Sequence, residues 1–141
     1  VGGFTHTDRV SLAREKAMRA LQTVKLDQKA AVQARNLNLC EQKRLEVARA
    51  LATEPKLIML DEVMAGLNQT EVAEVMDIVL EIRELGITVV IIEHIMQAVM
   101  SISDNITVLS FGQKIAEGVP SEIATNPEVI SVYLGSDYAL K

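Results

Sequence analysis

The sequence predicts an α/β fold built around a mostly parallel sheet. Two runs made almost entirely of apolar residues, 57–60 and 88–92, have the length and composition of strands that are buried on both faces. A helical pattern of apolar residues over 68–85 separates the two runs, which is the strand–helix–strand order of parallel sheets. Further helical periodicity precedes the first run, so we expect helices to open the chain.

Three helices are predicted ahead of the first strand. Apolar residues recur at helical spacing from residue 8 to residue 25, and Thr7 or Asp8 is suited to cap this helix. A short helix is expected after Asp27, and a third helix from about residue 41 to residue 52. The third helix has apolar residues on one face and most of its charged residues on the others, as expected of a helix packed on a core.

The central helix and the last third of the chain carry boundary signals. Asn68, followed three residues later by Glu71, resembles a capping box, and Gly86 is suited to end that helix. A helix is expected over residues 96–100.

Residues 105–110 and 114–117 predict a hairpin joined by residues 111–113. Two short helices, starting near Pro120 and Pro127, are expected to finish the chain.

Length and composition exclude several classes of protein. A chain of 141 residues has room for one ordinary domain. The net charge of −5 argues against a nucleic-acid surface, which needs a basic stripe. The single cysteine, Cys40, excludes an internal disulfide and suits a reducing compartment. No apolar run approaches the roughly 20 residues of a membrane helix, and no signal peptide opens the chain. We therefore expect a cytoplasmic protein without direct membrane insertion.

Acidic residues follow the first predicted strand, and a histidine follows the second. Asp61 and Glu62 come directly after the run 57–60, and His94 comes shortly after the run 88–92. Open α/β sheets bind ligands at the carboxyl ends of their strands. One carboxylate there can hold a hydrated Mg²⁺ while its neighbour activates water, and a histidine can contact a terminal phosphate. The alternative is that the acids only mark where a strand emerges into solvent, and that the histidine is a surface or capping residue.

Residues 37–45 immediately precede the third predicted helix. The backbone N–H groups at the start of a helix can bind an anion. The alternative is an ordinary capped helix, which these residues alone favour.

Taken in order and spacing, these segments resemble the ATP-binding cassette (ABC) family. Residues 37–42 match its signature motif, 57–61 its Walker B strand, Glu62 its catalytic glutamate, 65–68 its D-loop and His94 its switch histidine. The resemblance implies the P-loop NTPase fold of an ABC nucleotide-binding domain. It also implies a helical-subdomain remnant, a C-terminal hairpin and short helices.

A narrower resemblance covers nearly the whole chain. Several segments are similar to the ATPase subunits of importers for branched-chain and other hydrophobic amino acids: residues 41–51, 66–68, 92–94, 114–118, 126–130 and 133–135. The C-terminal pair of short helices is the part most typical of this subfamily.

The resemblance also implies cofactors, partners and roles for single residues. ATP and Mg²⁺ would be held between two ATPase subunits, which together drive a membrane permease from the inner face of the plasma membrane. Asp61 would hold Mg²⁺, Glu62 would polarise the attacking water, and His94 would contact the γ-phosphate. The remaining nucleotide-binding residues would come from the D-loop and, acting on the partner's nucleotide, from the signature loop: Asn68, Asn38, Leu39, Cys40, Glu41 and Gln42.

The sequence departs from the family pattern in several places. Nothing in it matches G-x-x-x-x-G-K-[ST], the phosphate-binding loop. We therefore expect the chain to represent the C-terminal half of the domain, with an incomplete sheet, and to be inactive in isolation. The resemblance divides it into a helical remnant with the signature helix (1–53), catalytic core elements (54–119) and C-terminal helices (120–141).

Single positions within the matched region also differ. Asn38 stands where the family usually has serine, Cys40 where the signature has its second glycine, Val63 where proline follows the glutamate, and Ile95 where aspartate follows the histidine. Glycine lets backbone approach a phosphate closely, so Cys40 predicts either a weakened copy or a loop that has adjusted.

Two other functions remain open at this point. One is an ABC-type ATPase that works outside transport, and the other is a non-catalytic, truncated dimerisation module.

Overall fold

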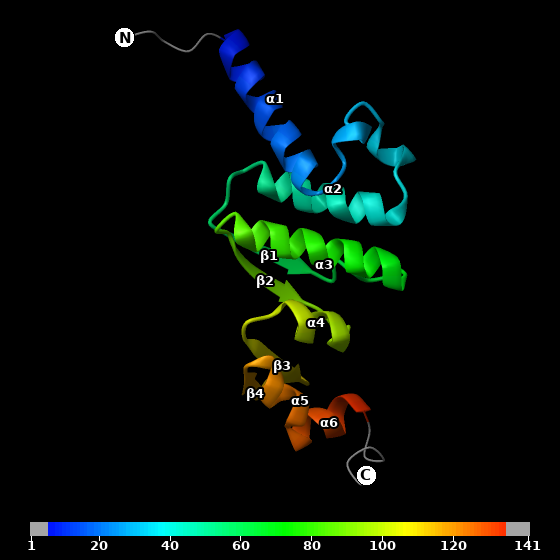
Figure 1. Ribbon diagram of the computed structural model, residues 1–141, viewed down its shortest axis with the longest axis vertical. Helices are drawn as coiled ribbons and strands as arrows, with labels where there is room; N and C mark the ends of the chain where they lie inside the picture. Colours follow the sequence, from blue (N-terminus) through cyan, green and yellow to red (C-terminus); the bar gives the residue numbers. More distant parts are fainter. Residues whose placement is uncertain (1–5, 135–141) are drawn as a thin grey trace, which may run out of the picture. The chain divides into compact units, whose positions relative to one another are not determined.

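A computed structural model describes residues 6–134 as an α/β protein in two compact units. The first unit extends to Glu93 and the second begins at His94 (Figure 1). The predicted α/β class and the incomplete sheet are confirmed, since the strands form two separate two-stranded sheets, one in each unit. The division into residues 1–53, 54–119 and 120–141 stays a prediction. None of the helices within residues 6–134 is long and apolar enough to cross a membrane.

Helix α1 spans His6–Thr23 and ends earlier than the sequence pattern predicts. Lys25 has a left-handed backbone with φ of 57°. Its N–H donates to the carbonyl of Gln22 at 2.9 Å, and the N–H of Leu26 donates to the carbonyl of Leu21 at 2.8 Å. These two bonds form a Schellman motif, which turns the chain out of the helix although no glycine is present.

Two single turns of 3-10 helix, η1 (Asp27–Lys29) and η2 (Ala34–Asn36), lead into α2 (Leu39–Leu51). Helix α2 begins two residues before the predicted start because Asn38 and Glu41 form a capping box. The short helix expected after Asp27 corresponds to η1.

Strand β1 (Leu57–Asp61), helix α3 (Gln69–Glu84) and strand β2 (Thr88–Ile92) form the predicted strand–helix–strand unit. The two strands pair in parallel, with Leu57 opposite Thr88 and Asp61 opposite Ile92. Figure 1 shows α3 running alongside α2, and Arg44 of α2 makes an ion pair of 3.4 Å with Glu74 of α3. Asn68 caps α3 as predicted, in a capping box with Glu71.

Burial of this sheet is one-sided, whereas the solid apolar runs predict a sheet buried on both faces. Along β1, Ile58 and Leu60 are buried but Leu57 and Met59 are exposed. Helix α3 contributes a buried stripe to the covered face, made of Val75, Ile78, Val79 and Ile82. The opposite face of the two strands exposes apolar side chains.

The second unit is a hairpin packed with three short helices. Helix α4 spans Met96–Ile102, and strands β3 (Ile106–Ser110) and β4 (Gln113–Gly118) pair antiparallel, with a register shift between Val108 and Leu109. The turn consists of Phe111 and Gly112, whose φ angles of 47° and 77° match a type I′ turn. Gln113 therefore belongs to the strand rather than to the predicted turn.

Helices α5 (Pro120–Thr125) and α6 (Pro127–Leu134) start at the two predicted prolines. The core of this unit consists of Ile106, Val108, Ile123 and Val129. Gly135, the last residue of the segments that resemble the importer ATPases, lies outside the described residues. Within residues 6–134, β2 pairs only with β1 and β3 pairs only with β4.

Candidate functional site

The candidate acids lie at the carboxyl end of β1. Asp61 is the last residue of the strand and pairs in register with Ile92 of β2. Glu62 follows it, and the backbone N–H of Glu62 donates to the carbonyl of Ile92 at 2.9 Å. Both acidic residues are exposed. The end of β1 therefore presents two adjacent acidic residues to solvent, at the edge where α/β sheets bind ligands.

Glu62 has an unusual backbone conformation. Its φ is 46°, in the left-handed region that residues with a side chain rarely adopt. Its carbonyl accepts hydrogen bonds from the backbone N–H of Ala65 and from Nζ of Lys43, both at 3.2 Å. Because Lys43 lies on α2, the helix that contains signature residues 39–42 is bonded directly to the backbone of the candidate catalytic glutamate.

The turn after Glu62 is anchored in the first unit by buried residues. Val63 and Met64 are 5% and 0% exposed, so valine fills the position where proline is typical of the family. The backbone N–H of Met64 donates to Oε1 of Glu93 at 2.7 Å. Glu93 follows β2 directly and is half-buried. The sequence pattern does not single out Lys43 or Glu93, although an acid directly after a predicted strand is a signal for such a role in the case of Glu93.

Asn68, a predicted nucleotide-binding residue, has a structural role as the cap of α3. Its Oδ1 accepts from the backbone N–H groups of Thr70 at 3.0 Å and Glu71 at 3.1 Å, and its own N–H donates to Oε2 of Glu71 at 2.9 Å. Asn68 is exposed. Its contact with nucleotide stays a prediction.

The polar side chains of the signature segment bond to their own surroundings. Oδ1 of Asn38 accepts from the N–H of Glu41 at 2.9 Å, and the N–H of Asn38 donates to Oε2 of Glu41 at 3.1 Å. Nε2 of Gln42 donates to the carbonyl of Leu37 at 2.8 Å. A recognition surface formed by this segment would therefore depend on backbone N–H groups at the start of α2 more than on its side chains.

Cys40 and Leu39 point in different directions. Cys40 is 2% exposed, and burial raises the pKa of its thiol even though Arg44 acts in the opposite direction. Leu39 is 50% exposed, and its Cδ2 lies 3.2 Å from where a Cβ on Gly66 would be. The thiol therefore packs inside the unit instead of covering the exposed start of α2. Whether this copy is weakened or adjusted stays a prediction.

Glu41 is buried, 8% exposed, and its carboxylate accepts a hydrogen bond from Nζ of Lys29. That bond, together with the one from the Asn38 backbone, lowers the pKa of Glu41 below its ordinary value of 4.5. A carboxyl whose pKa is lowered by folding stabilises the folded state at pH values above the pKa that the same group has in the unfolded chain. This stabilisation is lost as the pH falls through the pKa of the folded state.

We expect Glu41→Gln to be less stable than the natural chain at neutral pH, because the amide cannot pair with the Lys29 cation. The difference in free energy of unfolding should stay constant down to about pH 5 and shrink below it. Urea unfolding between neutral pH and about pH 3 measures this difference. Glu46→Gln, at an exposed glutamate of the same helix, is the matched control. A difference in free energy of unfolding that does not change with pH would contradict the conclusion that the bond from Lys29 lowers the pKa of Glu41.

His94 follows Glu93 and is the first residue of the second unit. It is exposed. The predicted contact of this histidine with a terminal phosphate stays a prediction.

The residues at this edge suit a hydrated magnesium ion better than a metal held by protein ligands alone. Within residues 6–134, no group of three or more His, Cys, Asp or Glu side chains could hold a metal ion. Mg²⁺ commonly binds through one or two carboxylates, retained water and substrate phosphates. The exposed Asp61, next to Glu62, fits that mode of binding.

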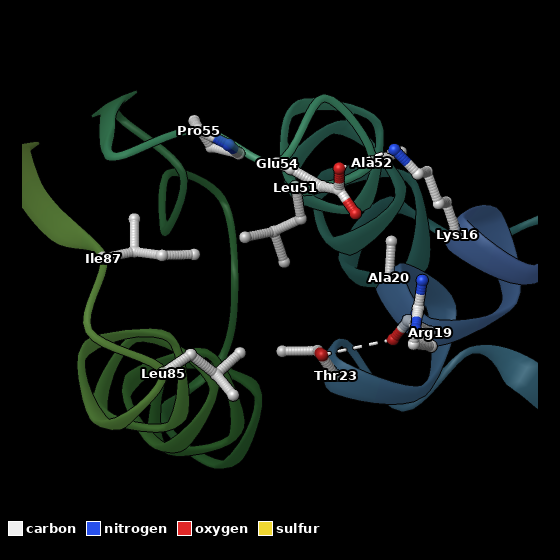
Figure 2. Close-up of a pocket in the computed structure, with 10 residues that line it drawn as sticks. All are labelled: Lys16, Arg19, Ala20, Thr23, Leu51, Ala52, Glu54, Pro55, Leu85 and Ile87. Atoms are coloured by element: carbon white, nitrogen blue, oxygen red, sulfur yellow. Dashed lines mark hydrogen bonds and ion pairs between the residues drawn. The ribbon is translucent and has the colours of Figure 1, made fainter. Parts of the chain in front are cut away.

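A pocket of about 240 Å³ lies at the opposite ends of the strands (Figure 2). Leu51, Leu85 and Ile87 point into it, and Pro55 lies at its edge. Because Pro55 and Ile87 precede parallel strands of five residues, the pocket is separated from the acids by roughly 15 Å of strand. It is therefore not part of the candidate site.

Two family models match this chain. The model described as "ABC transporter" matches residues 5–65, which includes the signature segment, β1 and Glu62. The model described as "Branched-chain amino acid ATP-binding cassette transporter" matches residues 113–139, the region of β4, α5 and α6.

Curated relatives and solved structures agree with these models. The chain is 44% identical over 126 residues to the high-affinity branched-chain amino acid transport ATP-binding protein LivG of Salmonella typhimurium, covering 89% of this chain and 49% of the relative. It is 44% identical over 124 residues to the corresponding protein BraF of Pseudomonas aeruginosa, covering 87% and 49%.

A crystal structure of an ATP-binding cassette of an ABC transporter, in its ADP conformation, matches with a TM-score of 0.79 and 34% identity. That match covers 88% of this chain and 50% of the solved chain. This chain thus spans about half the length of the relatives it matches. Its strand–helix–strand unit, its candidate acids and these matches show that it belongs to the family of ABC transporter ATP-binding proteins.

Proposed function

We propose that this chain forms the C-terminal half of the ATP-hydrolysing subunit of an importer for branched-chain or other hydrophobic amino acids. The observation that carries the proposal is the 44% identity to two transport ATP-binding proteins for branched-chain amino acids. The match of residues 113–139 to a branched-chain family model supports the same substrate class.

In this proposal the carboxyl end of β1 acts on the γ-phosphate of ATP. Glu62 orients and polarises the attacking water, and Asp61 holds Mg²⁺ through bound water. When bound, Mg²⁺ neutralises charge on the phosphates. The contacts of the Glu62 backbone with Ile92 and Lys43 support this role, because they restrict where its carboxylate can lie.

The signature segment acts on the nucleotide of a second ATPase subunit. Its recognition depends on the positive end of the α2 dipole and on the first backbone N–H groups of the helix, those of Leu39 and Cys40. The capping box and the Lys29–Glu41 pair support this role because they fix the start of the helix. His94 contacts the γ-phosphate held by its own subunit. Asn68 belongs to the D-loop, residues 65–68, which follows shortly after Glu62 in the sequence.

The proposed partners are a second ATPase subunit, identical or different, and membrane permease subunits. The complex works at the inner face of the plasma membrane, with this subunit on the cytoplasmic side. Nucleic acid is not a proposed partner, because the chain carries a net charge of −5.

Uptake of labelled leucine tests the proposal. We expect a full-length subunit that carries this segment to restore ATP-dependent leucine uptake in cells that lack their own ATPase subunit for branched-chain amino acids. Uptake of a charged amino acid serves as the control and should not change. ATP hydrolysis without any effect on uptake would instead favour an ABC-type ATPase outside transport. Dimer formation without hydrolysis would favour a non-catalytic module.

A further inference from the structure

The strained conformation of Glu62 depends on contacts from outside its own turn. Its left-handed φ of 46° is not favoured by the residue itself. The bond from its N–H to Ile92 fixes the turn where it leaves β1. A second bond to this end of β2 comes from Met64, two residues later, whose backbone N–H donates to a side chain.

That acceptor is the carboxylate of Glu93. Its Oε1 lies 2.7 Å from the backbone nitrogen of Met64, a distance typical of hydrogen bonds to a charged group. Met64 is completely buried, so water does not replace a lost partner easily. Ile92 and Glu93 are consecutive residues, and they bind the N–H groups of Glu62 and Met64. The turn that carries Glu62 is thereby fixed at two points to the end of β2.

We infer that Glu93 is a positioning residue for Glu62, acting through the Met64 amide. The inference rests on the proposed role of Glu62 in ATP hydrolysis. Glu93 does not touch the reacting atoms in this scheme. It holds the turn that carries Glu62 against the end of β2, and so supports the left-handed backbone of that residue.

Removing the acceptor should lower turnover without weakening nucleotide binding. In a full-length subunit that carries this segment, we expect Glu93→Ala to reduce kcat for ATP hydrolysis about 10- to 100-fold, with KM for Mg-ATP unchanged, because a displaced catalytic group costs rate. Glu93→Gln retains an oxygen acceptor for the Met64 N–H and should keep kcat within a few-fold of the natural subunit. Glu84→Ala, at an exposed glutamate at the end of α3, is the matched control.

Amide hydrogen exchange gives a measurement that does not depend on activity. The Met64 amide should exchange about tenfold faster or more in Glu93→Ala, and close to the natural rate in Glu93→Gln. Unchanged exchange at Met64 in Glu93→Ala would overturn the inference, as would a rise in KM with kcat unchanged. Equal loss of kcat in the Ala and Gln variants would also overturn it, because the acceptor would then be irrelevant.

A double variant separates this inference from the proposed function. If Glu93 acts only through Glu62, adding Glu93→Ala to Glu62→Gln should reduce kcat no further. Additive losses would overturn the inference and show that Glu93 acts through another group. If Glu62→Gln itself leaves hydrolysis unchanged, the proposed function of Glu62 fails instead, whatever Glu93→Ala does to exchange at Met64.

Discussion

Replacing Glu62 with glutamine should lower ATP hydrolysis by a full-length subunit carrying this segment about 10²–10⁴-fold, the usual contribution of a positioned general base. The side chains are nearly equal in size, and the Glu62 backbone is held by Ile92, Lys43 and Ala65 through bonds that do not involve its carboxylate. The substitution therefore removes basicity without moving the turn.

ATP binding should persist in this variant, so the ATP-bound dimer should accumulate. Single-turnover hydrolysis and equilibrium nucleotide binding, measured on the same preparation, separate the two effects. Glu84→Gln, at an exposed glutamate of α3, is the matched control and should hydrolyse ATP at the natural rate. Hydrolysis within a few-fold of the natural rate in Glu62→Gln would show that this carboxylate is not the base.

Self-association of the isolated chain is the second expected result. One face of β1 and β2 exposes apolar side chains: Leu57 (50%), Met59 (65%), Val90 (39%) and Ile92 (53%). The register brings Met59 opposite Val90, so these residues form one continuous surface. Parallel strands are normally covered on both faces, and unpaired strand edges favour association. We expect a mass that rises with concentration and a melt that depends on concentration.

Placing a charge on this apolar surface should weaken the self-association of the isolated chain. Burial of a Met or Ile side chain contributes roughly 1.5–3 kcal/mol, and these side chains are only partly exposed. Met59→Lys should therefore raise the dissociation constant about tenfold, measured by sedimentation velocity over a concentration series. Leu85→Lys changes an equally exposed leucine at the other end of the strands and should have a smaller effect. A monomeric mass at every concentration in the natural chain would contradict this prediction.

Features that depend on neighbouring residues could be predicted from the sequence. The two apolar runs became β1 and β2, and the Asn68–Glu71 pair became the cap of α3. The two late helices start at Pro120 and Pro127. In each case the cause is local: strand propensity, a capping side chain three residues from its partner, or the fixed φ of proline.

The start of α2 and the end of α1 differ from what the apolar pattern predicts. The Asn38–Glu41 spacing is the same capping pattern as that of Asn68 and Glu71, and it sets the start of α2 two residues earlier than the apolar pattern did. The end of α1 depends on Lys25 adopting a conformation for which lysine has no preference, so the sequence could not indicate it.

By itself, the sequence determined the α/β class, the order of the elements and the position of Asp61 and Glu62 at a strand end, because these follow from periodicity and from contacts between near neighbours. Only the tertiary structure decided how Glu62 is held, since Lys43 and Glu93 reach its turn from 19 and 29 residues away. It also decided that the Cys40 thiol points inward and that one face of the sheet is exposed. Such features depend on which elements pack together, and no pattern within one element encodes that choice.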